Sequence, residues 1–90
     1  DKYHMWFGFR KLYDNKGKVG SYSIGYASSI NGVKWSRDDE LSGIEKSEEG
    51  WDSEMICYPD LVQTDNKLYL FYCGNGFGKD GFGYAECDLN

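Results

Sequence analysis

The chain has 90 residues, of which 18% are aromatic and 12 are glycine, so it has room for one small domain that is expected to be rich in β-strands. Its net charge of −5, without a cluster of Lys or Arg, argues against nucleic acid or an anionic membrane surface as a partner. No apolar run is long enough to span a bilayer and no signal peptide is recognisable, so the sequence predicts no membrane partner.

The first half of the chain predicts three strands. Residues 3–10 form an aromatic run with apolar side chains on both faces, which indicates a strand that is covered on both sides. Residues 22–28 follow as a second strand. The pair Asn31-Gly32 tolerates the positive φ angles of a type I′ turn, so we expect a tight hairpin into a third strand over residues 33–37.

An acidic crossover and three more strands make up the second half. The acidic stretch after residue 37 has room for a short helical turn, but a surface crossover over residues 38–53 is the simpler interpretation. The pair Asp65-Asn66 predicts another turn. It separates two of the strands that we expect over residues 56–63, 67–73 and 82–87.

The two halves of the chain repeat one another. Residues 2–8 (KYHMWFG) return as residues 67–73 (KLYLFYC), and residues 23–28 (SIGYAS) return as residues 81–86 (GFGYAE). A unit of two aromatic strands buries its faces against copies of itself, so the repeat predicts an all-β fold of stacked sheets. With the two units aligned, the chain is expected to hold about one and a half four-stranded antiparallel blades of a β-propeller.

Three segments resemble the five-bladed propeller glycosidases. Residues 26–35 (YASSINGVKW) resemble a hairpin of the arabinanase/xylosidase-type glycoside hydrolases of family 43 and their relatives, which include fructan-cleaving enzymes and mannoside phosphorylases. Residues 51–59 (WDSEMICYP) and 74–85 (GNGFGKDGFGYA) look like the closing blade of an uncharacterised branch of that superfamily. The resemblance runs through nearly all of the chain, which would make up about the C-terminal third of a complete member.

The resemblance implies a division of the chain and a function. Residues 1–37 would hold strands of one blade of a five-bladed propeller, residues 38–53 the crossover, and residues 54–90 the strands of the next, closing blade. The parent protein would act on glycosidic bonds of oligo- or polysaccharides. The aspartate base and glutamate acid of family 43 come from earlier blades, so no complete catalytic pair is carried over and the chain alone is expected to be inactive.

One end of the predicted sheets is the better candidate for a ligand site. Alternate loops of a meander lie at opposite ends of its strands, so the loops after Arg10 and Cys73 share one end with the segment that enters the strand over residues 56–63. Long irregular loops tend to carry function, whereas tight turns close structure. Carbohydrate-binding residues are therefore expected at this end.

Asp52 and Glu54 lie at this end, two residues apart, so that their side chains are expected to point the same way. Glycosidic cleavage uses two carboxyl groups, one as an acid and the other as a base or nucleophile. Two residues this close in sequence rarely flank a sugar from opposite sides, so at most one is catalytic, and Glu54 is the candidate. The alternative is that Asp52 caps a turn and Glu54 pairs with a neighbouring arginine.

Four residues are candidates for substrate binding: Trp51, Asp52, Arg10 and Asn75. Trp51 offers an aromatic face to a sugar ring, or packs at the edge of a blade. The forked donors of Arg10 suit a carboxylate or a sugar hydroxyl, although a solvated arginine is an equal alternative. Asn75 lies among glycines that let a ligand approach the backbone, unless the loop serves only to turn the chain.

The sequence predicts neither a cofactor nor a metal site. The cysteines Cys57, Cys73 and Cys87 match no metal-binding spacing and are expected to be small buried thiols, which favours a reducing, cytoplasmic setting. The chain begins at Asp1 rather than at methionine, which leaves room for a preceding segment. The expected partners are carbohydrate and either the remaining blades of a parent chain or other copies of this chain. A non-catalytic carbohydrate-binding or self-assembling β-module is the alternative function.

Overall fold

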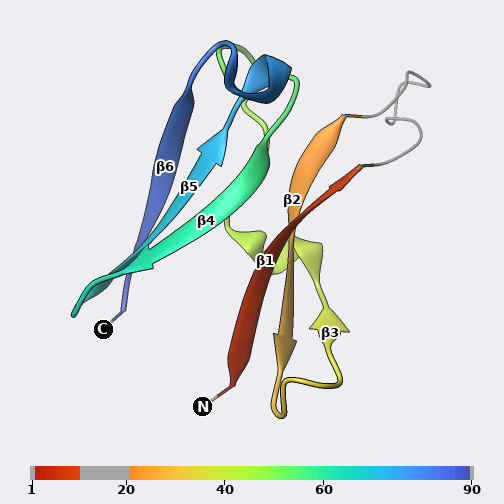
Figure 1. Cartoon of the computed structure of the whole chain (residues 1–90), viewed down its shortest axis with the longest axis vertical. Coiled ribbons are helices and arrows are strands. Elements are labelled where there is room, and N and C mark those ends of the chain that lie inside the picture. Colours follow the sequence, from red (N-terminus) through yellow and green to blue (C-terminus); the bar gives the residue numbers. More distant parts are fainter. Residues whose placement is uncertain (1, 11–20, 90) are drawn as a thin grey trace.

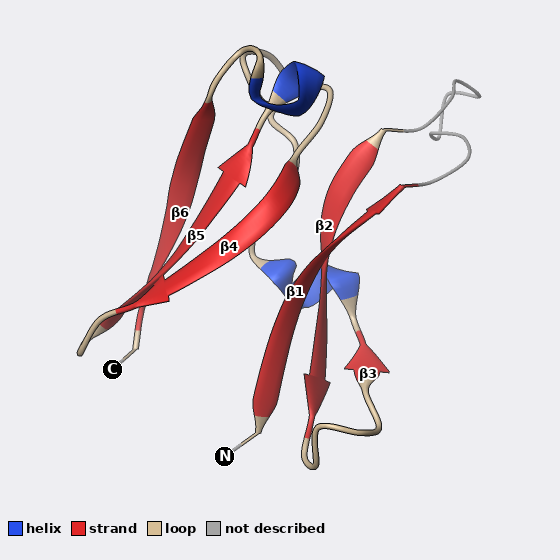
Figure 2. Cartoon of the chain, in the orientation of Figure 1, coloured by secondary structure: helices blue, strands red, loops and turns tan. Residues whose placement is uncertain are grey.

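Two antiparallel three-stranded sheets form the molecule (Figure 1, Figure 2). The computed structural model describes residues 2–10 and 21–89 and has no α-helix within these ranges. The prediction of an all-β fold is therefore confirmed. The elements are, in chain order, β1 (Tyr3–Arg10), β2 (Tyr22–Ser29), β3 (Ser36–Arg37), the 3₁₀ turn η1 (Asp39–Ser42), β4 (Cys57–Gln63), β5 (Lys67–Cys73), the 3₁₀ turn η2 (Asn75–Gly78) and β6 (Phe82–Asp88).

The sequence repeat is also a repeat of strand pairing. Phe7 of β1 lies opposite Gly25 of β2, and Tyr72 of β5 lies opposite Gly83 of β6, which are the counterparts that the repeat predicts. Each glycine leaves space for an aromatic ring. A Cβ atom on Gly25 would lie 2.7 Å from the Phe7 ring, and one on Gly83 would lie 2.7 Å from the ring of Trp51.

The core lies between the two sheets. It contains the buried residues Ile24, Ile56 and Tyr72, with three partly buried residues packed against them: Trp6, Ile44 and Trp51. The Trp6 indole N–H donates a hydrogen bond of 2.9 Å to the carbonyl of Ser42 in η1. The crossover between the sheets therefore contains a helical turn and helps to close the core, rather than running over the surface alone. The Ile56 N–H donates to the Tyr22 carbonyl at 3.2 Å and joins β2 to the entry of β4.

The connection from β2 to β3 corrects the predicted hairpin. Asn31 lacks the positive φ that a type I′ turn requires, although Gly32 has φ 75°. Instead, Asn31 Oδ1 accepts hydrogen bonds from the N–H groups of Val33 and Lys34 at 2.8 and 2.9 Å. These side-chain acceptors compete with the strand ladder, so the third strand covers Ser36–Arg37 and not the whole of 33–37.

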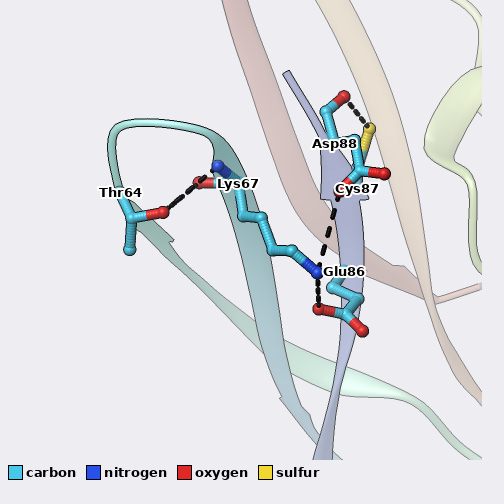
Figure 3. A network of polar contacts seen from close by, with 5 residues as sticks. All are labelled: Thr64, Lys67, Glu86, Cys87 and Asp88. Atoms are coloured by element: carbon cyan, nitrogen blue, oxygen red, sulfur yellow. Dashed lines mark hydrogen bonds and ion pairs between the residues drawn. The ribbon is translucent and has the colours of Figure 1, made fainter. Parts of the chain in front are cut away.

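The second sheet has the predicted turn at Asp65-Asn66, between β4 and β5 (Figure 3). The Thr64 N–H donates to the Lys67 carbonyl at 2.8 Å. The ammonium group of Lys67, the first residue of β5, pairs with Glu86 of β6 at 3.1 Å and with Asp88 of β6 at 3.7 Å. These ion pairs are exposed, so they contribute little to stability, but they mark the register of the β5–β6 pair.

The cysteines do not share one environment. Cys57 is buried, Cys73 is half-buried and Cys87 is exposed, so the expectation of three buried thiols is wrong for Cys87. The reason is the place of Cys87 near the end of β6, where the second sheet has no further strand among the described residues. No helix in the described ranges has the length and apolar character that crossing a membrane requires.

Candidate functional site

The segment that enters β4 is fixed by the side chain of Asn75, which is 6% exposed. The Asn75 Oδ1 atom accepts hydrogen bonds from the N–H groups of Glu54 and Met55 at 2.8 and 3.1 Å. Its Nδ2 group donates to the Gly50 carbonyl at 3.0 Å and to Ser53 Oγ at 3.4 Å. The amide is thus satisfied within the protein, and it positions Glu54 rather than offering a free donor to a ligand.

Asp52 is also occupied by a partner within the protein. It is 6% exposed, and its Oδ2 atom accepts a hydrogen bond of 3.0 Å from the Tyr72 hydroxyl. Burial, followed by this hydrogen bond, raises the pKa of Tyr72 to about 12. Asp52 bonds to a tyrosine of β5 instead of capping a turn, and it anchors the loop that carries Glu54 to the core.

Trp51 packs against the second sheet. Its ring lies 5.4 Å from the Tyr72 ring with an interplanar angle of 21°. A Cβ atom on Gly74 would lie 2.5 Å from this indole, and the corresponding distance from Gly83 is 2.7 Å. One face of Trp51 therefore belongs to the core, in agreement with the alternative that was left open for this residue.

Glu54 differs from Asp52 in that its side chain is exposed. The structure thus places the two carboxylates in different environments, although they are only two residues apart. A carboxylate in water on a fixed peptide is available to an external ligand, whereas a buried and paired carboxylate is not. Glu54 is the member of the pair that is open to solvent.

Three aromatic rings lie beside this segment and form what we call the aromatic shelf: Tyr22, Tyr58 and Phe77. The Phe77 ring lies 5.6 Å from that of Tyr22 and 6.0 Å from that of Tyr58. Tyr58 is 63% exposed and Phe77 is 52% exposed. The Arg10 guanidinium carbon lies 6.0 Å from the centre of the Tyr22 ring, so Arg10 reaches the shelf.

The shelf depends on unusual backbone conformations. Tyr58 has φ 55° and Phe77 has φ 57°, and these are the non-glycine residues with positive φ in the described ranges. Tyr58 lies in a β-bulge, because Cys57 pairs with Cys73 but Asp60 pairs with Phe71. The Phe77 N–H contacts Met55 Sδ at 3.4 Å, so the shelf lies against the residue that follows Glu54 in the chain.

Sequence reasoning did not identify Tyr58 and Phe77 as candidates. The available signal for Phe77 was its place between Gly76 and Gly78, because a large apolar residue within a glycine-rich turn has few neighbours to bury it. Tyr58 carried a weaker signal, since the following Pro59 is common at irregular points of a strand.

In the described ranges, the side chains able to ligate a metal ion are not clustered, and a depression lies away from the candidate site. No group of three or more His, Cys, Asp or Glu side chains in residues 2–10 and 21–89 is arranged to hold a metal ion. A depression of about 320 Å³ lies at the opposite end of the first sheet, between Lys2 and the β2–β3 connection with Asn31 and Lys34. It is lined by neither of the carboxylates discussed above.

Comparison with known proteins gives two relatives. No protein-family model matches the chain, and no solved structure matches it significantly. The chain is 35% identical over 83 residues to "Uncharacterized protein MT1551" of Mycobacterium tuberculosis (strain CDC 1551 / Oshkosh) and to "Uncharacterized protein Rv1502" of Mycobacterium tuberculosis (strain ATCC 25618 / H37Rv). Each match covers 92% of this chain and 25% of the relative. The chain therefore spans a quarter of the length of the curated relatives that it matches.

Proposed function

We propose that this chain is part of a glycoside hydrolase-like β-propeller, and that it forms one wall of a carbohydrate site at the end of the sheets where β4 begins. The observation that carries the proposal is that Glu54 is exposed on a fixed peptide, in the segment whose next residue, Met55, contacts the aromatic shelf. A sugar ring presents C–H groups to aromatic faces and hydroxyl groups to a carboxylate. Both kinds of partner meet at this end of the molecule.

The way in which the two sheets stack supports a propeller. The first sheet turns the face with Trp6 toward the core, whereas the second sheet turns the face with Tyr72 toward it. In the repeat the counterpart of Tyr72 is Phe7, which lies on the opposite face from Trp6. The two repeated strand pairs thus contact one another through non-equivalent faces, the Trp6 face of the first and the Tyr72 face of the second. Successive blades of a propeller are related in this head-to-tail way.

The outer faces support the same proposal. The outer face of the first sheet carries Tyr3, Met5, Phe7 and Phe9, and the outer face of the second carries Val62, Tyr69, Phe71 and Tyr84. Apolar side chains of this number suit cover by further sheets. The mycobacterial relatives, of which the chain spans 25%, have the length to provide such sheets.

Glu54 is the proposed catalytic residue, acting as the acid or the base, with a second carboxylate supplied by another blade. The test is the hydrolysis of a panel of 4-nitrophenyl glycosides and defined oligosaccharides by the full-length protein and its Glu54→Gln variant. A loss of about 100-fold or more in kcat/KM is expected. Glu49→Gln is the matched control, because Glu49 is an exposed glutamate of the crossover. Equal activity of wild type and Glu54→Gln would remove Glu54 from catalysis.

The alternative is carbohydrate binding without hydrolysis. It is favoured by the burial of Asp52, because this chain then offers one carboxylate of the pair, that of Glu54, which suffices to bind a sugar but not to complete the two-carboxylate mechanism. Titration of the full-length protein with the same oligosaccharides, followed by calorimetry, separates the two functions. Binding without turnover of any substrate in the panel would support the binding module. Absence of both binding and turnover would reject both candidates.

A further inference from the structure

Two of the three cysteines lie opposite one another in the second sheet. Cys57 at the start of β4 pairs in register with Cys73 at the end of β5. Register partners in an antiparallel sheet have Cα atoms about 4.5–5.5 Å apart, and their side chains point to the same face. A disulfide needs a Cα separation of about 4.4–6.8 Å. The two thiols are therefore placed for a bond that leaves the strand pairing intact.

The two thiols differ in their access to solvent. Cys57 is 2% exposed, and burial, together with the neighbouring Cys73, raises the pKa of its thiol. Cys73 is half-buried, so a small reagent reaches its sulfur first. The glycine-rich loop after β5 lies against this sulfur, because a Cβ atom on Gly78 would be 3.3 Å from Cys73 Sγ.

The third cysteine is placed elsewhere on the sheet. Cys87 lies opposite Leu68, near the end of β5 that is remote from Cys73. Leu68 and Cys73 are five positions apart in one strand, so their side chains point to opposite faces of the sheet. Cys87 is thus unable to pair with either of the other cysteines in the folded chain, and it serves as an internal control.

We propose that Cys57 and Cys73 are a dithiol pair that a small disulfide, such as oxidised glutathione, converts into a cross-strand disulfide. The Cys73 thiolate attacks one sulfur of oxidised glutathione, forms a mixed disulfide and releases one glutathione thiolate. Cys57 gives its proton to solvent, and its sulfur attacks the Cys73 sulfur and releases the second glutathione. Two protein thiols are oxidised to one disulfide, and one glutathione disulfide is reduced to two thiols.

The bond would connect the two segments that carry Tyr58 and Phe77, two of the three residues of the aromatic shelf. Cys57 directly precedes Tyr58 in the bulge of β4, and Cys73 precedes the loop that contains Asn75 and Phe77. A disulfide between them fixes the spacing of these segments at the loop end. This consequence holds whether or not the site binds sugar, so the proposal stands independently of the function proposed above.

The test uses the full-length wild-type protein, equilibrated with mixtures of reduced and oxidised glutathione, quenched with acid and alkylated. Peptide mass spectrometry is expected to find Cys57 linked to Cys73 at oxidising ratios, with Cys87 alkylated. The melting temperature of the folded protein is expected to rise on oxidation by about 4 °C, because the bond closes a loop of the chain. Addition of a reducing agent should return both readouts to their starting values.

Variants separate this pair from other thiol chemistry. Cys87→Ser is expected to keep the oxidation-dependent rise in melting temperature, and Cys73→Ser is expected to lose it. If Cys73→Ser fails to fold, the wild-type peptide map decides the question without any variant. Alkylation of both Cys57 and Cys73 at every glutathione ratio would overturn the proposal, as would a link that forms only in urea.

Discussion

At the scale of single residues, the backbone of Tyr58 and Phe77 sets the shape of the loop end. Both residues have left-handed φ values and rings that are more than half exposed. A left-handed conformation costs a non-glycine residue about 1–2 kcal/mol, and the exposed rings regain little of this by burial. Non-glycine residues in such conformations gather at binding sites, and Phe77 contacts Met55, the residue that follows Glu54.

Substitutions at position 77 measure this backbone cost. We expect Phe77→Gly to be more stable than Phe77→Ala by about 1 kcal/mol, because both remove the ring but only glycine adopts φ 57° without strain. Phe82, an exposed residue of β6 without positive φ, is the matched control. At position 82 the order should reverse, with the alanine variant the more stable by urea unfolding. The same order at both positions would contradict the assignment of strain to Phe77.

The Tyr72–Asp52 pair predicts a loss of stability at high pH. The pKa of Tyr72 is raised from 10.0 to about 12 in the folded chain, so between these values the unfolded chain loses a proton that the folded chain keeps. The contribution of the protonated Tyr72 to the stability of the fold is complete below pH 10 and disappears as the pH rises through about 12. Between pH 8 and pH 11, the free energy of unfolding of the wild type should fall by about 1 kcal/mol more than that of Tyr72→Phe. Urea unfolding of both proteins at the two pH values checks this, with Tyr84→Phe as the control that leaves the pair intact.

At the scale of the elements, the repeated strand pairs depend on glycine for close packing. Gly83 of β6 lies under the Trp51 ring, whereas a Cβ atom on Gly8 of β1 would have no atom within 4 Å. Gly83→Ala is therefore expected to destabilise the protein by about 1–3 kcal/mol through overpacking. Gly8→Ala should be neutral or stabilise by a few tenths of a kcal/mol, because alanine costs less entropy in a strand. Thermal unfolding of the two variants distinguishes them, and equal effects would count against the packing of Trp51 on β6.

The strands were predictable from sequence because their signal is local. The aromatic runs over β1 and β5 and the repeated segments over β2 and β6 gave both the strands and their partners. The hairpin after β2 was mispredicted because Ser29 and Asn31 supply acceptors for the loop N–H groups, and local side-chain bonding overrode the turn preference of Asn31-Gly32.

The candidate site was predictable only in part. Its location followed from the order of the loops, and Glu54 is exposed there. The role of Asn75 depends on hydrogen bonds to residues some 20 positions away, which no local pattern reveals. The shelf depends on the bulge between Cys57 and Asp60, which is a property of the pairing with β5 and is not encoded in β4 alone.

At the scale of the whole molecule, the two sheets meet through unlike faces, so each sheet turns a second apolar face away from the core. On that face of the first sheet, Arg37 lies over the rings of Phe7 and Phe9. In the repeat, the outer face of the first sheet corresponds to the core-facing side of the second sheet, and the outer face of the second sheet corresponds to the core-facing side of the first. The outer face of the first sheet in one copy therefore suits the outer face of the second sheet in another copy. Contacts between unlike faces do not close on themselves after two copies. If further sheets cover these faces in a longer protein, their removal would leave the faces free to contact other copies of the chain.

The isolated 90-residue chain is therefore expected to self-associate without a fixed stoichiometry. Light scattering with size-exclusion chromatography should give a mass that increases with concentration. Tyr84→Lys, which places a charge on the outer face of the second sheet, should lower that mass at equal concentration. Val33→Lys is the control, since Val33 lies exposed in the β2–β3 connection, away from both faces. A monomer at every concentration would contradict this expectation.

The backbone hydrogen bond between the two sheets has a consequence for local unfolding. Each sheet has its own ladder of backbone hydrogen bonds, whereas the Ile56 N–H to Tyr22 carbonyl bond joins β2 to the entry of β4. Hydrogen–deuterium exchange reports cooperative units of this kind, because amides that open together exchange together. The two sheets should thus appear as two units of separate protection, and the Ile56 amide should exchange at the rate at which they part. The exchange rate of the Ile56 amide would therefore measure how often the two repeated units separate.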